Sequence, residues 1–298
     1  MALPDEIRAA CARVAAAARH VRIDHAAVGP YAATLGPAPV EPAEQPYADP
    51  EQGAAHLLQL DAVNFGSGWF PTLRKPPGHS GFRTVESGLL AHGPWSAPAL
   101  QRVDAAECAA VFGQEPGHPL MALYATALAE LGGHVEAAHR GAFLALARAG
   151  HGSAVALAEH LAALPTWRDV STYDGARVPL FKRAQLTAAD LHRHGLAPAA
   201  DVGALTLMAD NLVPHVLRID GVLEFAPALV DRIDREELLE HGSPEEVEIR
   251  ACAVHAVELL VAARGDTTAA AVDDLLWRRG AASRYKAHPR HRARTTAY

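Results

Sequence analysis

The sequence predicts a mainly α-helical fold in one globular domain, and three observations support this. From Pro119 onward, apolar residues recur at steps of three and four, which gives a helix one buried face. Most of these segments close on glycine or proline, the residues that end helices. The alternation with a period of two that is typical of strands is confined to short pieces such as residues 21–23 and 82–85.

The same spacing predicts where each helix lies. One helix covers about residues 4–19, and a short helical stretch ends near Leu60. The other predicted helices cover residues 120–131, 135–149, 153–164, 180–193, 244–263 and 267–279. The predicted stop signals are Gly132-Gly133, Gly150, Pro165, Gly195 and Gly265. The clearest start is Ser243-Pro244-Glu245-Glu246, where serine can cap free N–H groups and two carboxylates face the positive end of the helix.

Length and composition are those of a globular protein. The chain has 298 residues and a hydrophobic content of 50%, which excludes a disordered tail protein. A proline-rich stretch at residues 36–50 predicts an irregular connection. We therefore expect residues 1–50 to form an N-terminal helix and extension packed on a main domain of residues 51–298.

Charge and cysteine usage limit the partners and the compartment. A net charge of −7 disfavours binding to polymeric nucleic acid, which is a polyanion. Any nucleic-acid ligand is therefore expected to be a small fragment or to bind locally. Three cysteines without a C-x-x-C pair indicate a reducing, cytoplasmic setting. No apolar run approaches the roughly 20 residues of a membrane span, and no signal peptide is evident, so no membrane partner is expected.

Several common catalytic motifs are missing. The chain has no G-x-G-x-x-G, G-x-x-x-x-G-K-[ST], H-E-x-x-H or G-x-S-x-G pattern, which disfavours dinucleotide-dependent dehydrogenases, P-loop enzymes and zincins. Its 17 histidines include no i, i+4 pair on a clear helix. The sequence therefore predicts neither a metal site nor an organic cofactor.

The first candidate segment is residues 61–70, a glycine-rich bend that carries Asn64, Phe65 and Trp69. Aromatic faces can stack on a flat base, and an amide can both donate to and accept from its edge. Alternatively, the aromatic side chains fill the core beneath a turn. The local pattern by itself favours this second interpretation.

The second candidate is Lys182. Only 3 of the 27 basic residues are lysines, so a lysine in a polar helix suggests a phosphate ligand or a catalytic ammonium group. The alternative is a solvated helix face with Phe181, Ala184 and Leu191 directed inward.

The third and fourth candidates are carboxylates on later segments. Asp210 precedes a helix that begins with proline, so it is either an N-cap or a catalytic carboxylate in a cleft. Glu248 shares a buried stripe with Cys252 and His255, which makes it a structural hydrogen-bond acceptor or a ligand contact.

Two charged features nearby are less specific. The i, i+4 spacing of Glu246 and Arg250 predicts a surface ion pair. The basic tail, residues 279–294, is typical of a solvated end and is less often a phosphate site.

These motifs together resemble the queuosine salvage protein family. The resemblance rests on Phe181-Lys182-Arg183-Ala184-Gln185, on Ala209-Asp210 with Val213-Pro214 and Val216-Leu217, on Glu246-Val247-Glu248-Ile249-Arg250-Ala251, and on Leu276-Trp277. It is strongest over residues 165–279, beginning at Trp167-Arg168-Asp169, and is traceable upstream at Asn64-Phe65 and Ser80-Gly81-Phe82.

The resemblance implies a helical fold akin to the helix-hairpin-helix DNA glycosylases. It also implies hydrolysis of the N-glycosyl bond of queuosine 5′-monophosphate, or of a close 7-deazaguanine relative, with release of queuine for tRNA modification. The substrate is thus a small modified nucleotide, and the reaction calls for no cofactor or metal.

The site residues follow position by position from the resemblance. Asp210 matches the family's catalytic aspartate, and Lys182 matches a lysine expected to contact ribose or phosphate. Asn64 and Phe65, with Trp69 in the same segment, match a signature expected to line the base pocket. A further set of substrate contacts is expected at Glu248 and Arg250, in the motif on the long helix.

Two departures from the family pattern keep an alternative open. Asn211-Leu212 replaces the usual Tyr-Arg after the catalytic aspartate, and Gly66-Ser67-Gly68 interrupts the compact Asn-Phe-x-Phe-Trp run. These replacements are expected to rebuild the pocket wall, so the substrate could be another modified nucleotide or nucleoside. The alternative function is a catalytically altered protein of the same fold that binds nucleotides or nucleobases.

Overall fold

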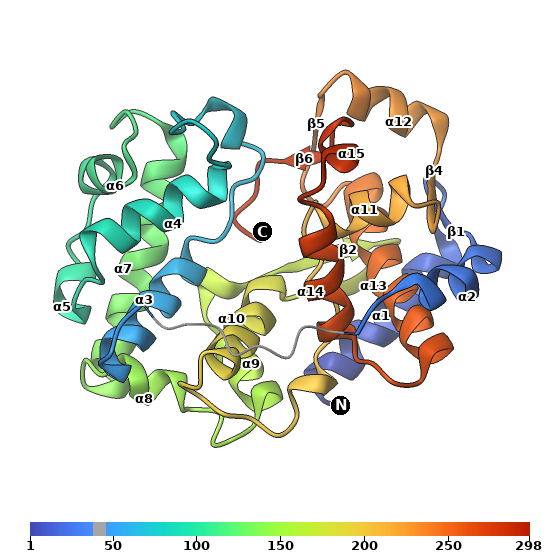
Figure 1. The fold of residues 1–298 in the computed structure, drawn as a ribbon. Helices are drawn as coiled ribbons and strands as arrows, with labels where there is room; N and C mark the ends of the chain where they lie inside the picture. The colour runs from blue at the N-terminus through green and yellow to red at the C-terminus, as the bar shows by residue number, and fades with distance from the viewer. Residues whose placement is uncertain (38–45) are drawn as a thin grey trace. The chain divides into compact units, whose positions relative to one another are not determined.

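The computed structural model describes residues 1–37 and 46–298, and it is mainly helical as predicted (Figure 1). Part of the predicted proline-rich extension, residues 38–45, lies outside the described residues. None of the described helices combines the length and the apolar character that crossing a bilayer requires. The likeness to helix-hairpin-helix glycosylases stays a prediction.

The chain divides into two compact units that interleave along the sequence. Unit 1 comprises Met1–Glu41, Asp169–Gln185 and Asp201–Arg294. Unit 2 comprises Pro42–Arg168, Leu186–Ala200 and Thr295–Tyr298. The boundary predicted at residue 50 coincides with no end of either unit, and the division into residues 1–50 and 51–298 stays a prediction.

Unit 1 is built around the long helix α13 (Pro244–Arg264). Among the described residues, four other helices pack against it, namely α1 (Leu3–Ala17), α2 (His25–Thr34), α11 (Val213–Ile219) and α14 (Ala269–Arg279) (Figure 1). Both predicted ends of α13 are confirmed. The Ser243 side chain accepts the N–H of Glu246, and Gly265 ends the helix with a φ of 74°.

Short elements complete unit 1. Its further helices are the start of α10 (Lys182–Arg193), η3 (Val202–Ala204), α12 (Pro227–Asp234) and α15 (Ser283–Lys286). The strands form three pairs: β1 (Val21–Ile23) antiparallel to β4 (Leu223–Phe225), β2 (Val170–Tyr173) antiparallel to β3 (Ala176–Pro179), and β5 (Leu238–Leu239) parallel to β6 (Arg292–Ala293). The strand expected at residues 21–23 is therefore confirmed, with Val21 opposite Phe225.

Unit 2 is helical and is organised around α7 (Pro119–His139). Its other elements are α3 (Pro50–Ala62), η1 (Phe70–Thr72), α4 (Gly81–His92), α5 (Ala97–Leu100), α6 (Ala105–Phe112), α8 (Phe143–Ala147), α9 (Ala154–Ala162), η2 (Pro165–Trp167) and the remainder of α10. The helices α3, α5, α6 and α8 all contact α7.

The predicted stop at Gly132-Gly133 is wrong, because α7 continues through both glycines to His139. A Cβ atom at Gly132 would lie 2.5 Å from Cβ of Leu100, so this glycine permits the close packing of α5 instead of ending α7. The helix ends where Arg140 and Gly141 take φ values of 53° and 79°. The predicted helix at residues 135–149 is therefore divided into the end of α7 and the separate α8.

The strand expected at residues 82–85 is also wrong. These residues form the first turns of α4, whose N-cap Ser80 accepts the N–H of Arg83 at 3.1 Å. Four alternating residues carry less information than a cap followed by a packed helix face.

Candidate functional site

Asp210 lies in a bend just before α11. The preceding segment, residues 205–209, is buried, whereas Asp210 itself is partly exposed. One carboxylate oxygen accepts the N–H of Leu212 at 2.6 Å. The other oxygen has no hydrogen-bond partner among residues 1–37 and 46–298. The N-cap of α11 is Leu212, so the N-cap interpretation of Asp210 is wrong. The side chain is held on one side and open on the other.

Arg250 fixes the backbone immediately before Asp210. Its side chain is fully buried, and its Nε donates to the carbonyl oxygen of Ala209 at 2.9 Å. Its two terminal nitrogens donate to both carboxylate oxygens of Asp169, at 3.0 and 2.7 Å. Because the guanidinium is planar and both partners are buried, this bidentate pair sets one geometry.

The same Asp169 carboxylate positions the start of α10. One of its oxygens accepts the N–H of Lys182 at 3.0 Å, while its backbone carbonyl accepts the N–H groups of Leu180 and Phe181. Phe181 takes a φ of 47°, which is unfavourable for a bulky residue and persists only because its surroundings determine it. The Arg250–Asp169 pair thus connects the backbone next to Asp210 with the backbone of Lys182.

Gln185 adds a second connection between these segments. Its side-chain oxygen accepts the N–H of Thr206 at 2.9 Å, and its amide nitrogen donates to the Thr206 hydroxyl and to the Leu180 carbonyl, both at 3.0 Å. Lys182, Arg183 and Gln185 are all buried, so the solvated helix face expected in the alternative is wrong. Its other part is confirmed, because Phe181, Ala184 and Leu191 are buried.

Glu246 is buried beside Arg250, and the predicted surface pair is therefore also wrong. The carboxylate of Glu246 lies 3.6 Å from the Arg250 guanidinium and accepts the N–H of Gly242 at 3.0 Å. Burial alone would raise the pKa of Glu246, but His241 and the charge of Arg250 lower it to about 2. The i, i+4 spacing predicts the pair correctly but not its burial, which arises because other elements cover α13 on several sides.

Glu248 is a buried acceptor for the N-terminal segment. One of its oxygens accepts three backbone N–H groups, from Arg19 at 3.0 Å, His20 at 2.6 Å and Val21 at 3.0 Å. The other accepts the Tyr173 hydroxyl at 2.7 Å. These contacts support a structural role for Glu248, and its contact with substrate stays a prediction. Arg250 is fully buried and donates to Ala209 and Asp169, so its contact with substrate also stays a prediction.

Unit 2 holds the remaining predicted residues, Asn64, Phe65 and Trp69. Phe65 and Trp69 are buried, and the Phe65 ring meets Tyr124 edge to face with a centroid distance of 5.1 Å. The Tyr124 hydroxyl also donates to the Phe65 carbonyl at 3.1 Å. Packing of this kind supports the core interpretation for both aromatic residues. The amide of Asn64 is partly exposed and has no hydrogen-bond partner in the described part of the chain.

The residues that depart from the family pattern after Asp210 are packed inward. The Asn211 amide is buried and donates to the His291 carbonyl at 3.2 Å. Leu212 lies against Gly280, where a Cβ atom would come within 2.6 Å of the leucine side chain. Both residues therefore hold α11 to the C-terminal part of unit 1.

Three arginines of the basic tail are paired with carboxylates. Arg279 and Arg284 pair with Asp220, and Arg292 pairs with Glu236. Arg290 differs from these arginines. It is exposed, yet desolvation lowers its pKa, an effect that the charge of Asp210 opposes.

Asp169 was not predicted as a site residue, although a signal for it existed. An arginine on the apolar face of a helix needs a buried carboxylate partner, and Asp169 stands in the Trp167-Arg168-Asp169 segment. Spacing along one helix could not identify a partner that lies 81 residues away in the sequence.

Comparison with known proteins finds several relatives of this chain. It is 36% identical to a relative from Sphaerobacter thermophilus over an alignment that covers 96% of this chain and 95% of the relative. A relative from Dictyostelium discoideum is 36% identical over 44% of each chain, and one from Bos taurus is 33% identical over 38% of this chain and 36% of the relative. Each of the three is named queuosine 5′-phosphate N-glycosylase/hydrolase.

The chain is thus a mainly helical hydrolase of the class that acts on N-glycosyl bonds. The model of the queuosine salvage protein family matches residues 83–298, and the chain belongs to that family. The matched range includes Lys182, Asp210, Glu248 and Arg250, and it begins after Asn64, Phe65 and Trp69.

Proposed function

We propose that this protein hydrolyses the N-glycosyl bond of queuosine 5′-phosphate and releases queuine, which then becomes available for tRNA modification. The names of its relatives support the reaction and the substrate. One observation on this chain carries the proposal furthest: Asp210 has one oxygen held by the Leu212 N–H and the other open.

The reaction suits a single, firmly held carboxylate. As the bond between the sugar and the base breaks, its electron pair leaves with the base, and positive charge develops on the sugar. The Asp210 carboxylate stabilises this charge, which exists fully only in the transition state. Its open oxygen orients the attacking water, whose oxygen bonds to the anomeric carbon and whose proton passes through the carboxylate to solvent. The departing base takes up one proton from solvent, so that the products are ribose 5-phosphate and neutral queuine.

The packing around Asp210 limits its movement. Arg250 holds the carbonyl of the preceding residue, and Leu212 holds the carboxylate itself. A carboxylate that is already oriented needs little reorganisation during the reaction, which is the main advantage of a protein site over water. Queuine is a 7-deazapurine and lacks the ring nitrogen whose protonation helps purines leave, so this orientation matters more.

We assign contact with the ribose or the phosphate to Lys182. A lysine ammonium group is a compact charge suited to phosphate, and this lysine belongs to the motif that Asp169 and Gln185 hold in place. Phosphate binding away from the reacting bond contributes energy that orients the sugar. Arg290 supplies a second positive charge; desolvation lowers its pKa, and the charge of Asp210 opposes this shift. We assign Arg290 to the substrate phosphate as well.

We assign Asn64 to recognition of the base. Its amide is partly exposed and makes no hydrogen bond to a described residue, whereas Phe65 and Trp69 are buried within unit 2. An amide that donates and accepts can pair with the edge of a guanine-like base.

Purified protein incubated with queuosine 5′-phosphate, queuosine and GMP tests the proposal, with the free base followed by chromatography. We expect base release from queuosine 5′-phosphate, slower release from queuosine because the phosphate contact is lost, and none from GMP. Absence of release from all three would overturn the assignment. Tight binding by calorimetry without product would instead identify a catalytically altered binding protein.

A further inference from the structure

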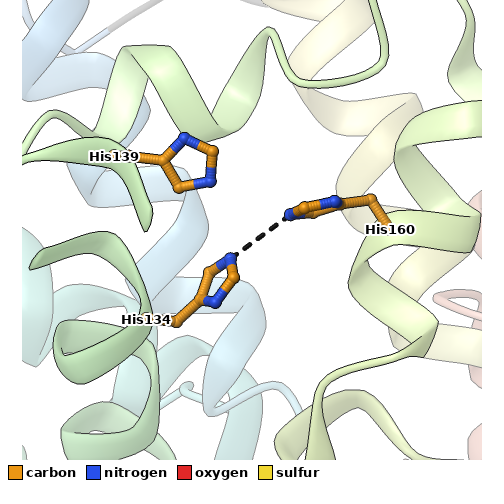
Figure 2. A group of neighbouring side chains, drawn as sticks. All are labelled: His134, His139 and His160. Carbon is orange, nitrogen blue, oxygen red and sulfur yellow. Dashed lines mark hydrogen bonds between the residues drawn. The ribbon is translucent and has the colours of Figure 1, made fainter. Parts of the chain in front are cut away.

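Three histidines of unit 2 converge on one point. His134 and His139 come from the last part of α7, and His160 comes from the last turn of α9 (Figure 2). Each side chain is partly exposed, so an ion could enter from solvent. One ring nitrogen from each residue lies within 4.8 Å of the other two.

The spacing of these nitrogens is close to that of a metal site. Zn–N bonds of about 2.0–2.1 Å place two nitrogens of a tetrahedral site about 3.4 Å apart. The Nε2 atoms of His134 and His160 are 3.2 Å apart. A ring nitrogen of His139 lies within 4.8 Å of the nitrogens of the other two, so His139 needs a small side-chain movement to reach the same spacing.

The contact between Nε2 of His134 and Nε2 of His160 is a hydrogen bond, which a metal ion would replace (Figure 2). Nε2 of His139 is buried and makes no hydrogen bond to any described residue. Desolvation, together with the neighbouring imidazoles, lowers the pKa of both His134 and His139. Neutral imidazole is the form that binds metals, so the cluster is ready to act as a ligand set near neutral pH.

The ends of two helices add a favourable field. His139 and His160 both lie in the last turn of their helices, where the unpaired carbonyl groups create partial negative charge. Directly after His139, Arg140 takes a φ of 53°, which turns the chain sharply and ends α7 at this point. The partial negative charge at these two helix ends favours a cation bound by the three rings.

We propose that His134, His139 and His160 bind one divalent transition-metal ion, Zn²⁺ by preference, with water in the fourth position. Imidazole ligands suit Zn²⁺ and Co²⁺, and three protein ligands with an open position form a recurring tetrahedral arrangement. The ion would connect the end of α7 to α9. The proposal is independent of the glycosylase activity, because none of the three residues is assigned to the substrate.

The sequence could not have identified this site. His134 and His139 stand at i, i+5 and not at i, i+4, and the third ligand comes from another helix. Local spacing predicted no metal site for this reason.

Metal titration of untagged, chelator-treated protein tests the proposal, with Co²⁺ followed by its visible absorption and Zn²⁺ by competition. We expect one tight equivalent in the unaltered protein, with the intense absorption of tetrahedral Co²⁺. The variants His139→Ala and His160→Gln should each bind at least about a hundredfold more weakly. His79→Ala, an exposed histidine outside the cluster, should bind as tightly as the unaltered protein.

The shift in Tm on addition of Zn²⁺ is a second measurement, which can also be made on variants of lower stability. Zn²⁺ at about a hundred times its Kd should raise the Tm of the unaltered protein and of His79→Ala by several degrees, and should leave His160→Gln unchanged. Equal Zn²⁺ affinity in His139→Ala and the unaltered protein would overturn the proposal. So would the absence of a tight equivalent in the unaltered protein.

Discussion

The Asp210 segment of unit 1 and the Asn64 segment of unit 2 are held in different ways. The first depends on buried charges, with Arg250 bonded to the Ala209 carbonyl and to Asp169. The second depends on aromatic packing, with Phe65 against Tyr124. Buried ion pairs fix orientation at a high desolvation cost, whereas aromatic packing fixes position and leaves a neighbouring amide open. The difference is the one expected from the roles we propose, catalysis by the charged Asp210 and base recognition by the neutral Asn64.

Removal of Arg250 should give the largest effect. Arg250→Met leaves the buried carboxylate of Asp169 unpaired, and we expect the free energy of unfolding to fall by about 3–5 kcal/mol. Urea denaturation measures this. The control is Arg278→Met, which removes an exposed arginine paired with Asp274 and should change stability by less than about 1 kcal/mol. Similar values for the two variants would contradict the central role of the buried pair.

Acid should destabilise the protein through buried neutral histidines. Burial lowers the pKa of His215 and His291 in unit 1, and of His56 in unit 2, to about 4. Between about pH 6.5 and pH 4 the unfolded chain binds more protons than the folded one, so stability decreases as the pH falls through this window. Each histidine contributes up to about 3 kcal/mol.

Urea denaturation at several pH values measures this dependence. The variant His291→Gln should flatten the slope, and His79→Gln, at an exposed position, should leave it unchanged. A stability that is constant from pH 7 to pH 4.5 would contradict the prediction.

Two asparagines give a matched comparison of a structural and a recognition amide. Asn211→Ala removes a buried hydrogen bond to His291 and should lower the free energy of unfolding by about 1–3 kcal/mol. Asn64→Ala should change stability by less than about 0.5 kcal/mol, because its amide has no partner among the described residues, and should lower kcat/KM by about 10- to 100-fold. Thermal unfolding and base-release kinetics measure the two effects. An unchanged kcat/KM in Asn64→Ala would contradict the proposed contact between Asn64 and the base.

Arg290→Ala should give the smallest effect. Loss of one exposed charge near the phosphate should raise KM by about 5- to 10-fold and leave kcat largely unchanged. Arg284→Ala removes a tail arginine already paired with Asp220 and should leave KM unchanged. The increase in KM should diminish at high salt. Equal KM values for the two variants would exclude Arg290 from the phosphate site.

The sequence predicted what depends on local pattern. The helical class, the Ser243 cap, the end of α13 at Gly265 and the short strand at Val21–Ile23 all follow from neighbouring residues. The break expected at Gly132 failed because the reason for that glycine is another helix. The burial of Glu246 and the pairing of Arg250 with Asp169 depend on which faces of α13 other elements cover. Spacing along one helix carries no such information.

Asp210→Asn tests the central claim most directly. The amide keeps an oxygen that can accept the Leu212 N–H, so the bend is retained and only the negative charge is lost. We predict that the rate of queuine release from queuosine 5′-phosphate falls by about a thousandfold or more, with the free energy of unfolding within about 1 kcal/mol of the unaltered protein. A release rate within about tenfold of the unaltered protein would show that Asp210 is not the catalytic carboxylate.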